Sequence, residues 1–268
     1  MHRDADIFFL AGQLPLLLPA FALVLFRVAG LMMAAPLFGS SSVPVRVRVL
    51  VAFAIALTLF PLVGASVPAR LEFGDMVIGV VGEVLIGLAM GTAVGLVIVG
   101  AELAGELGGQ QAGFSLGQIV NPMSNSESTV FAQIYGLVFA AVFLGVGGHR
   151  ALVRALLDTF AVIPLGSFRA DARMTTLFGD TLTSAFELAV RLAAPVLIAM
   201  FLASVALGLL SRSIPQLNIL TVGFAIRALL AIAIAAAALT VSEDAFVEAL
   251  TDMMGVIRSA FGLDPGRI

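Results

Sequence analysis

Long runs of apolar residues, separated by short polar breaks, follow one another along almost the whole chain. A helix needs about 20 predominantly apolar residues to cross a bilayer, and several runs approach or exceed that length. These runs cover residues 7–35, 43–63, 76–101, 129–146, 181–210 and 219–241. Prolines and small polar residues mark the breaks between them. The pattern predicts an all-α, polytopic membrane protein with about six long hydrophobic helices.

Two further segments carry a helical pattern without a continuous apolar run. Residues 151–165 are moderately apolar and carry charged residues four apart, which suits a helix that lies at an interface or packs on protein. Ser242 is followed by two acidic residues, so we expect it to be the N-cap of a new helix. Apolar residues then recur at helical spacing from Phe246 to Phe261. This pattern predicts a short amphipathic C-terminal helix for a membrane surface or a partner.

Residues 102–122 interrupt the apolar pattern with a polar, glycine-rich stretch. Its carboxylates, glutamines and glycines do not suit a lipid-facing helix, so we expect it to contact protein or water. The pattern predicts a helix that loosens at Gly108 and Gly109 into a loop and stops at Asn121 and Pro122. A plain polar loop between two spans is the alternative. The apolar side chains within the stretch favour burial, and therefore a re-entrant loop that fills a pore.

Composition narrows the class of protein further. The chain is 60% hydrophobic and 12% charged, with a net charge of −3, whereas soluble domains are about 25% charged. Its basic residues are all arginines and are scattered, which argues against a nucleic-acid partner. With no cysteine and two distant histidines, His2 and His149, no metal or cofactor is expected. Phosphate-binding and nucleophile motifs are absent from the sequence, so we do not expect an enzyme.

Small residues line one face of the helix expected over residues 76–101. Glu83, Gly87, Gly91 and Gly95 are four apart, so they fall on one side of that helix. Glycines at this spacing let another backbone approach closely. The face is either a seam that carries a polar stripe toward residues 102–122, or an ordinary tight helix contact.

Several charged residues lie inside apolar runs and need a partner. Glu187 and Arg191 are four apart with the acid first, which favours an ion pair on one helix. Arg27 and Arg227 have no acid within one turn, so we expect their partners elsewhere in this chain or in another subunit. Glu83 and Glu187 could also relay protons, which keeps a small-molecule or ion transporter as an alternative function.

The order and spacing of short motifs resemble the FliR family, the export-gate subunits of bacterial flagellar secretion. The resemblance covers nearly the whole chain. Each motif is weak by itself, and together they are specific. They lie at residues 27–30, 35–39, 43–48, 82–91, 105–115, 148–150, 163–166, 215–219 and 222–224.

The resemblance implies a pore-forming structural subunit of the flagellar type III protein export gate. Such a subunit passes unfolded flagellar proteins across the bacterial inner membrane, within the basal body. It joins FliP and FliQ in a helical assembly that docks against FlhB, and the matching subunit of an injectisome is the nearest alternative. Residues 1–175 would be a FliP-like part with a plug loop at residues 105–122. Residues 176–268 would be a FliQ-like helical pair with the amphipathic tail.

The family's plug also implies which residues would close the pore. They are Gly105, Glu106, Gln110, Gln111, Gly113, Phe114, Leu116, Gly117, Ile119, Asn121 and Pro122. Gln110 stands where methionine is frequent in the family, so this plug would seal less by apolar fit and more by amide hydrogen bonds. Helix packing and contacts between subunits are expected at a second set of residues. They are Arg27, Glu83, Gly87, Gly91, Gly95, Glu187, Arg191, Pro215, Gln216, Asn218 and Arg227.

Overall fold

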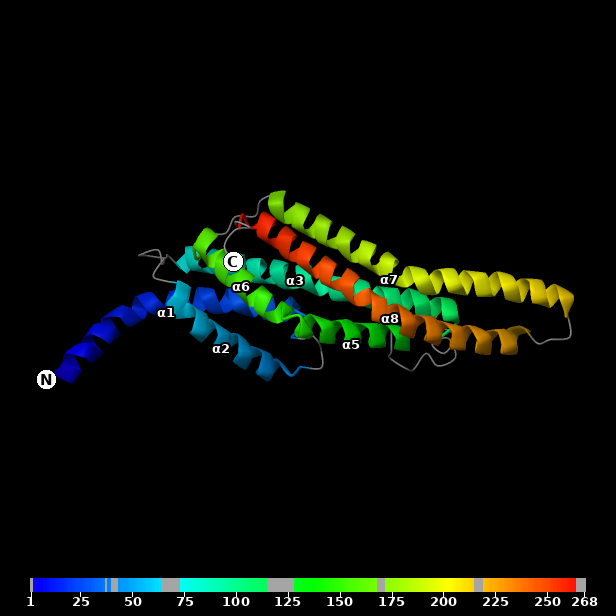
Figure 1. Cartoon of the computed structure of the whole chain (residues 1–268). Coiled ribbons are helices and arrows are strands. Elements are labelled where there is room, and N and C mark those ends of the chain that lie inside the picture. The colour runs from blue at the N-terminus through cyan, green and yellow to red at the C-terminus, as the bar shows by residue number, and fades with distance from the viewer. Residues whose placement is uncertain are drawn as a thin grey trace. The chain divides into compact units, whose positions relative to one another are not determined.

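Helices make up almost all of the part of the chain that the structure describes. The structure is a computed structural model and describes residues 2–36, 38, 39, 43–63, 73–114, 128–167, 172–214 and 219–263. The helices in order are α1 (His2–Ala34), α2 (Val45–Val63), α3 (Phe73–Ala112), α5 (Val130–Gly145), α6 (Gly148–Val162), α7 (Ala172–Ser213) and α8 (Ile219–Ala260) (Figure 1). The predicted all-α class is confirmed.

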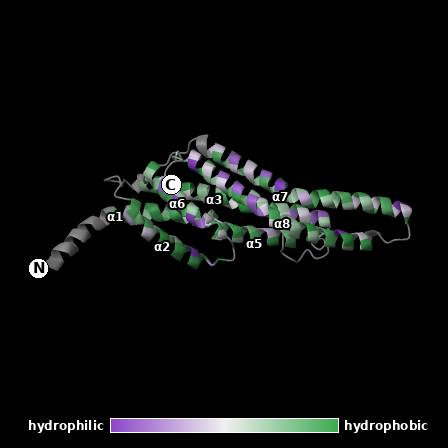
Figure 2. Ribbon diagram, in the orientation of Figure 1, coloured by the Kyte–Doolittle hydropathy of each residue, from purple (hydrophilic) through white to green (hydrophobic). Residues whose placement is uncertain are grey.

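Five of these helices are long and apolar enough to cross a membrane. The candidate spans are Leu17–Ala34, Val45–Val63, Met76–Ala112, Thr175–Ser213 and Thr221–Ala260. Helices α5 and α6 are bent by 64° at a short break and would form a sixth span if they cross together. Figure 2 shows that the hydrophilic positions of α7 and α8 gather in the first half of α7 and the second half of α8. The prediction of a polytopic membrane protein is therefore confirmed.

The chain divides into two compact units. The first contains Met1–Gly95, His149–Asp180 and Met253–Ile268, and the second contains Leu96–Gly148 and Thr181–Asp252. In the first unit, the ring of Phe21 on α1 meets two aromatic rings of α2 edge-on. The centroid distances are 5.5 Å to Phe53 and 5.6 Å to Phe60. These contacts hold α2 against α1.

The second unit is built from the last part of α3 with α5 and most of α7 and α8. Gly100 of α3 lies so close to α7 that a β-carbon there would stand 2.5 Å from the carbonyl oxygen of Ala185. The buried rings of Phe139 on α5 and Phe246 on α8 stack 4.7 Å apart. Close backbone contact and aromatic packing together form the core of this unit.

Helix α3 does not loosen at Gly108 and Gly109, and that prediction is wrong. The helix continues to Ala112 because both glycines serve close packing instead of a turn. A β-carbon on Gly109 would lie 2.7 Å from Thr129 Oγ1, and one on Gly108 would lie 3.3 Å from Val196 Cγ1. Both glycines therefore admit neighbouring groups against the helix.

Gly113 is the residue that ends α3. Its φ of 91° is a left-handed conformation that glycine adopts without strain. The Gly113 N–H donates to Gln110 O at 3.0 Å, and the Phe114 N–H donates to Gly109 O at 3.0 Å. This pair of bonds is the Schellman arrangement that satisfies the last carbonyls of a helix.

Ser242 is not the N-cap of a separate helix, so that prediction is also wrong. Helix α8 runs through it without a break, and the Ser242 hydroxyl donates to Ala238 O at 2.6 Å. Phe246, Leu250 and Ile257 are buried, as the amphipathic pattern of the tail requires. The apolar face of this segment is covered by the protein itself, which explains why the helix continues.

Candidate functional site

The polar end of α3 is tied to the start of α5 by the Glu106 carboxylate. The Thr129 backbone N–H donates to Glu106 Oε2 at 2.7 Å, and Gln110 Nε2 donates to Glu106 Oε1 at 3.0 Å. Thr129 is the N-cap of α5, and its hydroxyl oxygen accepts a hydrogen bond from the Ala132 N–H at 3.3 Å. A carboxylate at this place satisfies a free N–H and matches the positive end of the helix dipole.

An aromatic contact lies just beyond the end of α3. The ring of Phe114 stands 5.2 Å from that of Phe131 on α5 and 6.2 Å from that of Phe224 on α8. A β-carbon on Gly105 would come 2.6 Å from Phe131 O, so α3 and α5 are in close backbone contact one turn before Gly109. The chain therefore leaves α3 on a fixed base of aromatic and backbone contacts.

The described part of the predicted plug belongs to this base. Gly105, Glu106, Gln110 and Gln111 lie in α3, and Gly113 and Phe114 form the turn that follows it. The remaining plug positions lie outside the described residues. They are Leu116, Gly117, Ile119, Asn121 and Pro122.

Arg27 sits in the first unit as a fully buried cation with partners on α3, on α6 and in the turn after α6. It forms a salt bridge through its Nε to Glu83 Oε2, and both side chains are 0% exposed. Its terminal nitrogens donate to Thr159 Oγ1 at 3.1 Å and to Ile163 O at 3.2 Å. The guanidinium carbon also lies 4.2 Å from the centre of the Phe160 ring, a favourable cation–π distance. The expectation that Arg27 contacts protein is confirmed.

Glu83 uses its second oxygen to hold the turn after α6. Glu83 Oε1 accepts a hydrogen bond from the Gly166 N–H at 2.8 Å. Gly166 has a φ of 73°, and its Cα would lie 3.3 Å from a β-carbon placed on Gly79 of α3. Arg27 and Glu83 thus connect α1, α3, α6 and this turn. Thr159 could not be predicted as a partner from the sequence, because Arg27 and Glu83 both lie far from it in the chain.

The glycine face of α3 is a close helix contact with α1. A β-carbon on Gly87 would collide with the Arg27 carbonyl oxygen, and one on Gly91 would lie 2.7 Å from Leu31 O. On Gly95 the corresponding distance is 3.0 Å to Ala34 O. The tight-packing alternative therefore accounts for these three glycines within the chain.

Glu187 and Arg191 form the predicted pair on α7, and α8 adds a third member. The Arg191 guanidinium lies 3.7 Å from Glu187 Oε1 and 2.8 Å from Glu248 Oε2. All three side chains are more than half exposed. They line a shallow pocket between the two helices together with Asp252. Glu248 was not singled out from the sequence, because it lies 57 residues away from Arg191.

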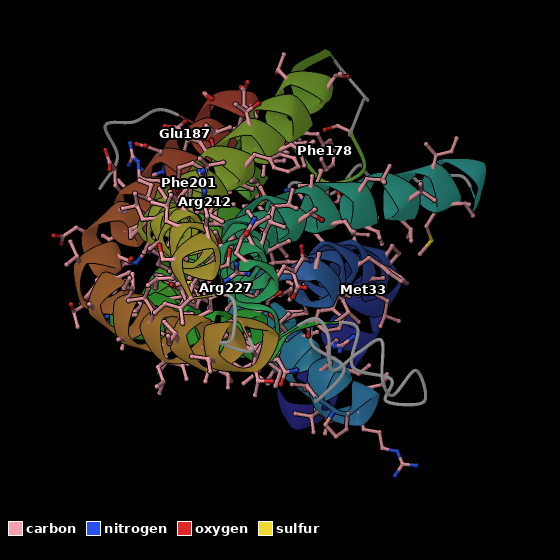
Figure 3. The ribbon with its side chains drawn as sticks, turned by 90° about the vertical axis from the view of Figure 1, so that its right-hand side faces the viewer. Met33, Phe178, Glu187, Phe201, Arg212 and Arg227 are labelled. Atoms are coloured by element: carbon pink, nitrogen blue, oxygen red, sulfur yellow. The ribbon has the colours of Figure 1, made fainter. Side chains whose placement is uncertain are left out.

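Arg227, labelled in Figure 3, lies on α8. It is only partly exposed, and its buried Nε has no hydrogen-bond partner among the residues that the structure describes. The neighbouring positions expected to contact other subunits, Pro215, Gln216 and Asn218, lie outside those residues. Within the described chain the structure thus leaves Arg227 Nε without an acceptor.

Large apolar side chains form an exposed ridge along α7. Phe201, labelled in Figure 3, is 67% exposed. Neighbouring members of the ridge are three or four residues apart, except for a gap of eight between Val190 and Ile198. In the second unit these residues are Leu182, Phe186, Val190, Ile198, Phe201, Val205 and Leu209.

Comparisons with known proteins agree with this architecture. Residues 18–253 match the family described as bacterial export proteins, family 1. The chain is 30% identical over 213 residues to the flagellar biosynthetic protein FliR of Escherichia coli strain K12, covering 80% of this chain and 81% of that protein. It is 27% identical over 214 residues to FliR of Bacillus subtilis strain 168, covering 79% and 82%. For FliR of Caulobacter vibrioides the identity is 29% over 220 residues, covering 82% and 88%. The chain therefore belongs to family 1 of the bacterial export proteins, with FliR proteins among its relatives.

Proposed function

We propose that the protein is a pore-forming structural subunit of the flagellar type III protein export gate. In this role it passes unfolded flagellar proteins across the bacterial inner membrane and is not an enzyme. The observation that carries the proposal is the family match over residues 18–253. The relatives compared above all have the flagellar name, which favours the flagellar branch over an injectisome.

The same proposal includes partners and a location. The subunit assembles with FliP and FliQ, docks against FlhB and lies in the flagellar basal body. Residues 1–175 are the FliP-like part, and residues 176–268 are the FliQ-like helical pair with its tail. The five candidate membrane spans support a place in the membrane.

Residues 105–122 are proposed as the plug of the closed pore. The support comes from its described base. Glu106 holds the start of α5 against the end of α3, so the chain leaves and re-enters helix at neighbouring points. The helix ends on either side of residues 115–127 are thus fixed to each other.

The contacts of the buried carboxylate argue against the transporter alternative. Glu83 would be a proton carrier in that alternative, yet both of its oxygens are engaged, one by Arg27 and one by the Gly166 N–H. Glu187 is exposed and shares Arg191 with Glu248. These pairings support a conduit rather than a pump.

The first experiment tests the gate assignment by assembly and export. The protein is produced with the FliP and FliQ counterparts of its own organism, and the complex is purified through a tag on this chain. We expect all three to co-purify, and we expect deletion of its gene to stop export of flagellar proteins. A chain that purifies alone, while FliP and FliQ assemble without it and export continues, would overturn the proposal.

The second experiment tests the plug. Residues 115–120 are replaced by a short glycine–serine linker, and the assembled complex is placed in lipid vesicles. We expect faster leak of a small dye or of ions than with the unchanged complex. A matching linker at residues 169–170 is the control and should leave leak unchanged. An intact complex whose leak is the same with and without residues 115–120 contradicts the plug assignment.

A further inference from the structure

We propose that Glu106 is a positioning residue of the gate: its carboxylate fixes the start of α5 against the end of α3 and so keeps the closed pore tight. This inference rests on the proposed function, because a leak has meaning only in a pore. It concerns the two anchors at Gly113–Phe114 and Ser128–Thr129.

The Glu106 side chain lies where the end of α3 meets the start of α5. Glu106 Oε2 accepts the Thr129 N–H at 2.7 Å, and Glu106 Oε1 accepts Gln110 Nε2 at 3.0 Å. Both carboxylate oxygens are therefore used, and one of them holds a backbone group of the other helix. The Gln110 contact keeps the Glu106 side chain pointed along α3 toward that group, since the two residues are one turn apart.

Two glycines make this approach possible. Gly105 and Gly109 are four apart on α3 and flank Glu106 on the face that meets α5. A β-carbon on Gly105 would lie 2.6 Å from Phe131 O, and one on Gly109 would lie 2.7 Å from Thr129 Oγ1. Any larger residue at these positions would push the first turn of α5 away from Glu106. The close contact and the carboxylate thus act at the same place.

A carboxylate suits this place better than a neutral side chain. The first N–H groups of a helix have no partner within it and together carry a partial positive charge. Thr129 satisfies one of them through its hydroxyl, which accepts from the Ala132 N–H at 3.3 Å. Glu106 satisfies the N–H of Thr129 itself. Without Glu106, that N–H would lose its acceptor, and the first turn of α5 would be free to fray.

Fraying of the first turn of α5 would also affect the anchor at Gly113–Phe114. Phe114 follows the last turn of α3 and packs on Phe131, which lies in the first turn of α5. If that turn frays, the contact between Phe114 and Phe131 loosens as well. Loss of one carboxylate therefore loosens both helix ends that flank residues 115–127, which include the rest of the proposed plug.

The test compares three variants in the assembled complex reconstituted in lipid vesicles. Glu106→Ala removes the acceptor, whereas Glu106→Gln keeps an oxygen that can accept the Thr129 N–H. Glu243→Ala removes an exposed glutamate of α8 and is the matched control. Two quantities are measured: dye or ion leak, and amide hydrogen exchange in the peptide that covers residues 128–134.

We expect Glu106→Ala to speed exchange in this peptide by about tenfold, because a hydrogen bond to a charged acceptor contributes roughly that factor or more. Leak should rise with it. Glu106→Gln should restore most of the protection and a leak near the unchanged level, and Glu243→Ala should alter neither. If Glu106→Ala prevents assembly, Gly109→Ala tests the same contact by steric displacement, with the same expected rise in exchange and leak.

Other outcomes overturn the inference. Faster exchange without extra leak would mean that Glu106 stabilises the helix junction but does not position the plug. Equal leak in Glu106→Gln and Glu106→Ala would mean that the oxygen acceptor is not what matters. The linker variant at residues 115–120 separates the two proposals: if it leaks while Glu106→Ala does not, this inference alone fails. If neither leaks, the plug itself is wrong.

Discussion

Removing one partner of the buried Arg27–Glu83 pair should destabilise the protein more than most single substitutions. The perturbations are Arg27→Met and Glu83→Leu, which replace each charged side chain by an apolar one of similar size. Either change leaves the other charge fully buried without its counter-ion, because both side chains are 0% exposed. Removing one member of a buried pair costs about 3–5 kcal/mol.

The double variant Arg27→Met/Glu83→Leu should be less destabilised than either single variant. It leaves no isolated charge, and replacement of a buried pair by apolar residues is often close to neutral. A residual loss comes from the Gly166 N–H, whose acceptor is Glu83 Oε1. An unpaired group of this kind costs about 1–3 kcal/mol. The coupling free energy between the two sites should therefore be at least about 3 kcal/mol, which is the upper end of the usual range.

The assay is unfolding of the detergent-solubilised protein by increasing amounts of a denaturing detergent. The chain has no tryptophan and a single tyrosine, so far-UV circular dichroism is the signal of choice. Glu187→Leu is the matched control, since it removes an acid from an exposed ion pair. Such pairs contribute less than about 1 kcal/mol. If the buried variants lose no more stability than this control, or if their effects simply add, the reasoning about the buried pair is refuted.

Three further predictions follow from single contacts. Gly87→Ala should destabilise the protein by about 1–3 kcal/mol because the new β-carbon meets backbone of α1; Gly208→Ala, where a β-carbon meets nothing within 4 Å, should be neutral or stabilising in the same unfolding assay. Arg227→Leu should leave membrane insertion unchanged but reduce co-purification with FliP and FliQ, since a buried guanidinium Nε needs an acceptor; undiminished co-purification would show that its acceptor is not in a partner. Phe246→Ala should cost about 3–5 kcal/mol, because its buried ring packs on Phe139; a loss below 1 kcal/mol would contradict that packing.

The fold class and most helices could be predicted from the sequence because apolar length is a local property. The apolar run at residues 76–101, for example, lies within α3. Its end was misplaced, since Gly108 and Gly109 look like breakers in isolation and become packing positions only when Thr129 and Val196 lie against them. The N-cap predicted at Ser242 was wrong for the same reason. Its acidic neighbours suggest a cap, but α8 continues because its buried face extends to Phe246.

For the candidate sites too, local features could be predicted from the sequence, whereas contacts between distant residues could not. Arg27 and Glu83 could each be recognised as charged residues that need partners, because charge inside an apolar run is visible in the sequence. Their pairing could not, since the two residues are 56 positions apart. The role of Glu106 as an acceptor for Thr129 likewise depends on α5 returning to α3. The i,i+4 pair of Glu187 and Arg191 was predictable because both lie on one helix.

The exposed ridge of α7 is longer than the hydrocarbon core of a bilayer is thick. Leu182 and Leu209 are 27 residues apart on one helix, which corresponds to about 40 Å at a rise of 1.5 Å per residue. The hydrocarbon core of a bilayer is only about 30 Å thick. A copy that inserts with α7 upright would therefore hold large apolar side chains against headgroups or water, and a tilted α7 would keep more of them in the hydrocarbon. In the proposed export gate, neighbouring subunits would cover the same side chains as they assemble.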